Sequence, residues 1–172
     1  MTERIYRETF VVGPESIDVL GHVNNCEYLK WMEHAAMHHA ASIGWGFAAL
    51  RSMGRTWVAR EHWVEYLRPS FEGERLEMFS WIQGWRAAAS LRRYAIRRAD
   101  ELIFVGATEW VFVDYEKRRP ALFCRRADCR ARKVRRFARG PRARIARDRK
   151  KRPLSAESRA LRGDDDEGFF AD

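Results

Sequence analysis

Residues 18–28 read D-V-L-G-H-V-N-N-C-E-Y and hold more hydrogen-bonding groups than the start of a helix needs. A carboxylate, an imidazole, two adjacent amides and a thiol stand within residues 18–26 alone. Gly21 permits a tight turn because it has no Cβ, and such a turn folds Asp18 back toward the residues that follow. The spacing therefore predicts a carboxylate near the N-terminus of a helix.

This arrangement suits the chemistry of acyl transfer. Asn24 or Asn25 can cap the helix, and the first-turn N–H groups that remain free lie at the positive end of the helix dipole. Such groups stabilise negative charge that develops on a carbonyl oxygen, while a nearby carboxylate serves as nucleophile or general base. A purely structural interpretation stays open, in which Asp18 and Asn24 only cap and brace the helix.

The three cysteines support weaker alternatives. Cys26 falls in the first turn of the predicted helix, where a thiolate is stabilised, and His22 is the nearest base in the sequence. Cys124 and Cys129 form one pair of potential zinc ligands without a second pair. An odd number of cysteines gives no disulfide framework, which indicates a reducing, cytoplasmic compartment.

Two histidines, His34 and His38, are spaced by four residues, so they share one face of the predicted helix and could bind a metal. No third ligand stands beside them in the sequence, and they lack the glutamate arrangement of a zinc protease. We therefore expect His34, His38 and the adjacent His39 to be packed or surface histidines, and no metal site.

Glu61 and Glu65 are placed on one face of a predicted strand, where a second carboxylate could serve catalysis. The structural alternative is exposure to solvent or cross-strand pairing with the arginines of a later strand. The same arginines have a shape that suits the phosphates of coenzyme A. They are Arg92, Arg93, Arg97 and Arg98.

The elements around this stretch are predicted from the hydrophobic period. A long helix begins at Asn24 and ends before Gly44, because apolar residues recur at intervals of three and four. Period-two patterns predict strands over 3–12, 56–67, 75–85, 90–98 and 102–113, the last of them central because it is apolar on both faces at its end. The order predicts an α+β domain, an antiparallel sheet wrapped around one long helix.

The charge of the chain is unevenly distributed. The net charge is +9, yet residues 1–120 hold sixteen Lys/Arg and sixteen Asp/Glu, against seventeen and eight in residues 121–172. We expect residues 1–120 to form the folded domain and residues 121–172 to be an arginine-rich, disordered tail with little apolar surface to bury. With few aromatic residues, the tail would bind nucleic acid only non-specifically. No apolar run approaches the ~20 residues of a membrane span.

Three segments together resemble a known family. They are D-V-L-G-H-V-N-N-C-E-Y-L before the long helix, W-V-A-R-E-H-W-V-E-Y-L-R-P, and T-E-W-V-F-V-D-Y-E-K-R-R-P at 108–120. In this order they resemble the hotdog-fold acyl-CoA thioesterases, and more narrowly the 4-hydroxybenzoyl-CoA thioesterase group, with kinship to acyl-ACP thioesterases. The resemblance covers residues 3 to about 120. The arginine-rich text after Pro120 departs from the family pattern.

The resemblance implies a role for each residue of the motif. Asp18 matches the family's nucleophile or general base, and Asn25 stands where a backbone N–H polarises the thioester carbonyl. His22, Asn24 and Tyr28 would shape the substrate pocket.

The family further implies a homodimer or homotetramer with sites between subunits, and an acyl-CoA or acyl-ACP substrate. It implies no metal and no cofactor apart from the coenzyme A of the substrate. The rival functions are a hotdog dehydratase, which the motif disfavours, and a non-catalytic acyl-binding or nucleic-acid-binding protein.

Overall fold

One antiparallel sheet holds about half of the residues that the structure describes. The computed structural model describes residues 5–86 and 88–122, all of which belong to one unit, Met1–Lys133. The strands follow the order β1-β3-β4-β5-β2, with the short β6 paired to β5. Their bounds are β1 Ile5–Val11, β2 Arg55–Tyr66, β3 Arg75–Arg86, β4 Ala89–Arg98, β5 Glu101–Asp114 and β6 Arg119–Pro120. Strands β1 and β2 therefore form the two edges of the main path.

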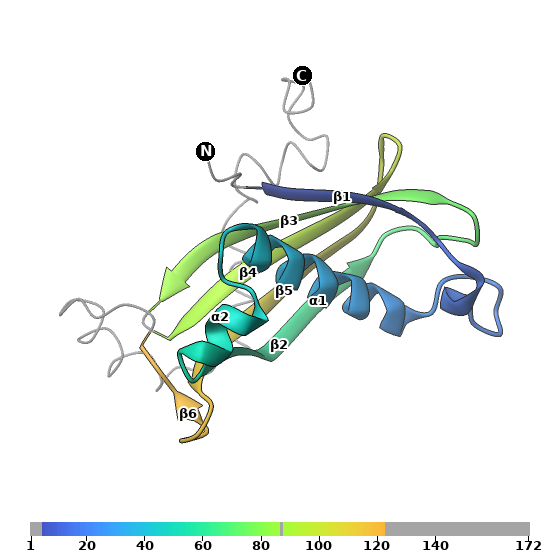
Figure 1. Cartoon of the computed structure of the whole chain (residues 1–172). Helices are drawn as coiled ribbons and strands as arrows, with labels where there is room; N and C mark the ends of the chain where they lie inside the picture. Colours follow the sequence, from blue (N-terminus) through green and yellow to red (C-terminus); the bar gives the residue numbers. More distant parts are fainter. Residues whose placement is uncertain (1–4, 87, 123–172) are drawn as a thin grey trace. The chain divides into compact units, whose positions relative to one another are not determined.

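A long helix, α1 (Asn25–Ser42), crosses one face of this sheet (Figure 1). Its apolar stripe is buried, and the side chain of Met32 is fully enclosed. Gly106 of β5 lies under this stripe, where an added Cβ would stand 3.0 Å from the Met32 sulfur. The absence of a side chain at Gly106 therefore lets the helix approach the sheet closely.

The core joins this helix to the central strands. It is made of buried residues from the helix, the loops at its start and strands β3, β4 and β5: Val12, Val23, Tyr28, Met32, Ala35, Ala36, Leu76, Met78, Tyr94, Ile96, Ile103 and Phe104. The expected α+β class is confirmed as an antiparallel sheet with a helix on one face. The expected positions of the four strands after Gly54 agree with the observed bounds to within one residue.

Three short elements were not foreseen. They are a 3₁₀ turn (η1, Pro14–Ser16), a six-residue helix (α2, Phe47–Ser52) and the two-residue strand β6. Each is too short to show a hydrophobic period.

One predicted pairing is wrong. Strand β5 lies between β2 and β4, so Glu61 and Glu65 cannot be direct cross-strand neighbours of the β4 arginines. Glu61 instead stands opposite Glu109, and Glu65 stands opposite Val105.

The predicted tail comprises residues 121–172. The structure describes residues 121 and 122 of this tail, and residues 123–172 lie outside the described ranges. The Ala121 N–H donates to the Phe112 carbonyl at 2.8 Å, which continues the pairing at β6 by one residue. Within the described ranges, no helix is long and apolar enough to cross a membrane.

Candidate functional site

The stretch from Asp18 to His22 forms a tight turn. One carboxylate oxygen of Asp18, Oδ1, accepts the Leu20 N–H at 2.8 Å, and the Asp18 carbonyl accepts the Gly21 N–H at 3.0 Å. The Asp18 N–H in turn donates to the His22 carbonyl at 2.9 Å. Gly21 has a φ of +80°, which L side chains rarely adopt, so a glycine is needed here. Within residues 5–86 and 88–122, the Asp18 carboxylate accepts a hydrogen bond through Oδ1 alone.

Backbone hydrogen bonds fix this turn to the start of α1. Ile17 and Val23 form an antiparallel bridge that closes the turn. The Asn24 N–H donates to the Ser16 carbonyl at 2.8 Å, and the Val23 N–H donates to the Ser70 carbonyl at 2.9 Å. The carboxylate and the helix start therefore belong to one braced unit.

Asn24 caps the helix, and Asp18 does not. The Asn24 side-chain oxygen accepts the Cys26 N–H at 2.8 Å, with Asn24 in an extended backbone conformation. The purely structural interpretation thus accounts for Asn24 and for one oxygen of Asp18, Oδ1, which braces the turn, but it assigns no role to the second oxygen, Oδ2. Among the described residues, the Asn25 N–H has no hydrogen-bond acceptor. It remains a free donor at the positive end of the helix dipole.

His22 lies against the carboxylate. Its Nδ1 atom is 3.7 Å from the second Asp18 oxygen, Oδ2, and 3.2 Å from the Val23 carbonyl oxygen. Because a carbonyl can only accept, Nδ1 carries a proton in this arrangement. The imidazole therefore presents an N–H near the free oxygen of Asp18.

Tyr28 lies in the core rather than on the exposed first turn. Its hydroxyl and the Ser70 Oγ are 2.5 Å apart, and its ring packs between those of Trp31, Tyr66 and Phe104. Burial raises the pKa of the Tyr28 hydroxyl above its ordinary value. Tyr28 therefore packs beneath the start of α1. Its role in a substrate pocket stays a prediction.

Two residues that sequence reasoning missed brace the same region. The Tyr66 hydroxyl donates to the Asn25 carbonyl at 3.2 Å, and burial raises the pKa of that hydroxyl. Ser70 holds both Val23 and Tyr28, as described above. Both lie more than forty residues from the helix start, beyond the reach of any local pattern. The sequence signal is the family segment at 57–69, which contains Tyr66 and is followed directly by Ser70.

The alternative cysteine mechanism gains no support. Cys26 is exposed, but His22 Nδ1 is directed at Asp18 and Val23, and the described residues contain no Cys26–His22 hydrogen bond. Cys124 and Cys129 lie outside the described residues.

The four arginines proposed for coenzyme A phosphates are engaged elsewhere. Arg98 bonds the Glu74 and Glu101 carboxylates at 2.8 and 2.5 Å, and Arg97 donates to the Asp100 carbonyl at 2.9 Å. Arg92 and Arg93 are buried, bonded to partners within the fold. The geometry therefore favours structural roles for this strand's arginines.

Away from the Asp18 turn, a pair of carboxylates lies on β2 and β5. Glu61 stands opposite Glu109, and Arg60 Nη1 is 3.7 Å from the Glu109 Oε1 atom. Burial is the main cause that raises the pKa of Glu109, the nearby charge of Glu61 adds to it, and Arg60 opposes it. The described residues show no link between this pair and the Asp18 turn.

The Asp18 turn and the helix start together supply two groups that act on a carbonyl. The helix offers a free N–H for the oxygen, and the turn offers a carboxylate oxygen for the carbon or for a water molecule. No metal ligand is needed for either role.

The amino-acid sequence of residues 12–129 matches the family model of the thioesterase-like superfamily, which is more than half of the chain. Among curated proteins, no sequence relative was found.

Solved structures share the fold at low identity. An acyl-ACP thioesterase from Bacteroides thetaiotaomicron is 23% identical with a TM-score of 0.65, over 69% of this chain and 49% of that one. The DHNA-CoA thioesterase from Staphylococcus aureus is 16% identical with a TM-score of 0.66, over 87% and 97%. A hypothetical protein from Staphylococcus aureus, solved in complex with CoA, is 16% identical with a TM-score of 0.67, over 78% and 84%. The chain spans about half the length of the acyl-ACP thioesterase.

Proposed function

Because the chain belongs to the thioesterase-like superfamily, we propose that it hydrolyses acyl-CoA thioesters to a free carboxylic acid and coenzyme A. The proposal is supported by one observation: the Asp18 carboxylate, which uses one oxygen to accept the Leu20 N–H, and the free N–H of Asn25 belong to the same hydrogen-bonded unit. The solved CoA complex and the DHNA-CoA thioesterase with this fold support CoA as the carrier. An acyl carrier protein is the alternative, supported by the acyl-ACP thioesterase.

In the proposed reaction the thioester oxygen accepts the Asn25 N–H, so that the helix start stabilises the negative charge of the tetrahedral intermediate. In the general-base form, Asp18 takes a proton from water as the water oxygen bonds to the carbonyl carbon. The carbon–sulfur bond then breaks, and the proton passes to the departing thiolate. In the nucleophilic form, Asp18 bonds to the carbon directly, thiolate leaves, and water hydrolyses the resulting anhydride.

The remaining motif residues have supporting roles in this proposal. His22, whose Nδ1 lies 3.7 Å from the free oxygen of Asp18, shapes the pocket beside that oxygen. Asn24 caps the first turn of the helix, and Tyr28 lies beneath the acyl group. The resemblance to the 4-hydroxybenzoyl-CoA group favours an aromatic acyl group. It also favours the full hotdog arrangement, in which the sheet wraps around α1.

A homodimer, or a homotetramer built from two of them, completes the proposal. Val19 and Leu20 follow Asp18 and are 101% and 76% exposed in the single chain, although both are large and apolar. A second copy that covers this turn would remove that surface from water. Sedimentation of the purified chain tests the proposal, and a monomer at micromolar concentration contradicts it.

The activity is tested by thiol release from a panel of acyl-CoAs, followed with a thiol-reactive dye. The panel contains benzoyl-CoA, 4-hydroxybenzoyl-CoA and straight-chain acyl-CoAs of increasing length. The proposal expects turnover of at least one member, with free thiol and free acid formed in equal amounts. Saturable binding without thiol release would instead identify a non-catalytic acyl-binding protein.

A further inference from the structure

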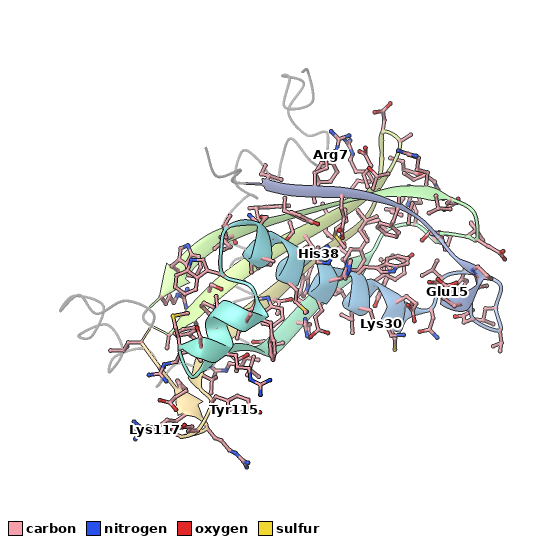
Figure 2. All side chains as sticks on the ribbon, in the orientation of Figure 1. Arg7, Glu15, Lys30, His38, Tyr115 and Lys117 are labelled. Atoms are coloured by element: carbon pink, nitrogen blue, oxygen red, sulfur yellow. The ribbon has the colours of Figure 1, made fainter. Side chains whose placement is uncertain are left out.

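A cluster of metal-ligating side chains lies on the outer side of α1, apart from the Asp18 turn. It consists of Glu8 from β1 and His34 and His38 from the helix, whose ligand atoms all lie within 4.8 Å of one another. Figure 2 shows His38 on α1 and Arg7, the neighbour of Glu8, on the adjacent edge strand. The sequence offered the two histidines without a third ligand, and the fold supplies that ligand from a strand 26 residues away from His34.

The three side chains converge. The Nδ1 atom of His34 is 3.7 Å from Glu8 Oε1, and the Nδ1 atom of His38 is 3.6 Å from Glu8 Oε2. The imidazole rings lie against each other, with centroids 3.7 Å apart. Two nitrogens on one helical face thus point at the two oxygens of one carboxylate.

These distances are close to those of a bound metal. Bonds of 2.0–2.2 Å in a tetrahedral site place neighbouring ligand atoms about 3.4 Å apart. Each histidine Nδ1 lies only ~0.3 Å or less beyond that value from the Glu8 oxygen nearest to it, and the two contacts use different oxygens of the carboxylate. The imidazoles are exposed, with 59% and 49% of their side-chain surface accessible, so they can adjust and a metal can reach them.

Tyr6 holds the Glu8 carboxylate with a hydrogen bond. Its hydroxyl donates to Glu8 Oε2 at 2.9 Å, and its ring stacks on the buried His39 at 5.6 Å. Ligating carboxylates in metal sites are commonly held by such an outer hydrogen bond. The same hydroxyl lies 3.3 Å from His38 Nδ1, a contact that would give way when the nitrogen binds a metal.

We propose that Glu8, His34 and His38 form a binding site for a divalent transition metal, with Tyr6 as a positioning residue. Two imidazoles and one carboxylate suit Zn²⁺, Co²⁺ or Ni²⁺, whereas Mg²⁺ and Ca²⁺ prefer oxygen ligands alone. Three protein ligands leave a further position for water. The metal would tie the edge strand β1 to α1, and this revises the expectation of no metal site.

The test is metal-dependent stability of the full, untagged chain. Zn²⁺ at a hundredfold excess over its Kd should raise Tm by about 5–10 °C, while Mg²⁺ should leave it unchanged. Each of Glu8→Gln, His34→Gln and His38→Gln should abolish the shift measured within that variant. The matched control is His62→Gln, which alters a histidine on β2 and should keep the full shift. Tyr6→Phe should weaken binding about 10- to 100-fold.

Co²⁺ provides a second readout that does not depend on stability. The wild-type chain should show visible d–d absorption on cobalt addition, and His38→Gln should lose it. The proposal is overturned if the wild-type chain shows neither the shift nor the absorption. It is equally overturned if the three ligand variants bind as tightly as the wild type, because the metal would then lie at the cysteines or elsewhere.

Discussion

The substitution Asn24→Asp separates two roles of the helix start, capping and charge stabilisation. The Asn24 side-chain oxygen accepts the Cys26 N–H at 2.8 Å. Aspartate and asparagine cap helices about equally well, and a carboxylate at this end also interacts favourably with the helix dipole by about 0.3–1 kcal/mol. We therefore expect the unfolding free energy of Asn24→Asp to equal or slightly exceed that of the wild type.

The expected effect on catalysis has the opposite sign. For the repulsion between a carboxylate at position 24 and an oxyanion bound to the Asn25 N–H, we take a separation on the order of 6 Å in Coulomb's law. Two unit charges at that distance repel by about 2.8 kcal/mol at an effective dielectric constant of 20, and by about 0.7 kcal/mol in water. Asn24 is exposed, so the lower part of this interval applies. We expect kcat to fall by roughly threefold to thirtyfold.

The assay is thiol release from the best acyl-CoA of the panel, together with urea unfolding of each variant. Asn24→Ser is the matched control, because serine caps the helix without charge and should keep activity close to the wild-type value. Asn24→Ala should lose about 1 kcal/mol of stability. If Asn24→Asp and Asn24→Ser have equal kcat, no negative charge develops at this helix start and the proposed oxyanion site is refuted.

Three further results are expected. Tyr66→Phe removes the hydrogen bond to the Asn25 carbonyl, so it should cost up to ~1 kcal/mol in urea unfolding and lower kcat/KM severalfold, and unchanged kinetics would exclude this brace. Glu109→Gln removes a buried carboxyl whose pKa is raised, so the variant should have a higher free energy of unfolding than the wild type at pH 7. This difference should disappear as the pH falls toward 4.5, and a difference that does not change with pH would contradict the prediction. His39→Leu deprives the buried Arg92 of a partner at 2.9 Å, so it should cost about 1–3 kcal/mol in urea unfolding, and a neutral result would show that Arg92 finds another acceptor.

The pH prediction follows from the direction of the Glu109 shift. A carboxyl with a raised pKa binds its proton more tightly in the folded chain than in the unfolded chain. Folding is therefore disfavoured as the pH rises through the ordinary value of 4.5 toward the raised value. Above that interval the ionised form is a constant penalty, which glutamine does not carry.

Local patterns in the sequence were sufficient for the main elements. The helix start at Asn24 and Asn25 was readable because capping depends on neighbouring residues alone. The four later strands were readable because their side chains alternate between two environments. The tight turn at Gly21 was readable for a similar reason, since its left-handed φ demands a glycine.

What escaped prediction depends on contacts between distant residues. Tyr66 and Ser70 brace the helix start from across the fold, and Glu8 meets His34 from another element. The interior position of β5 was predicted from its apolar residues and is confirmed, but its two neighbours, β4 and β2, were not predicted, because strand order is decided by packing over the whole sheet. The hydrophobic period of a strand predicts which of its faces is buried, but it does not predict which strand pairs with it.

The central claim is that the Asp18 carboxylate acts on the thioester, and Asp18→Asn tests it most directly. Asparagine keeps an oxygen that can accept the Leu20 N–H, so the turn and the unfolding free energy should be preserved. Thiol release from the best acyl-CoA should fall by about 10²–10⁴-fold in kcat, the range for loss of a general base. Turnover at the wild-type rate in a folded Asp18→Asn chain would contradict the account.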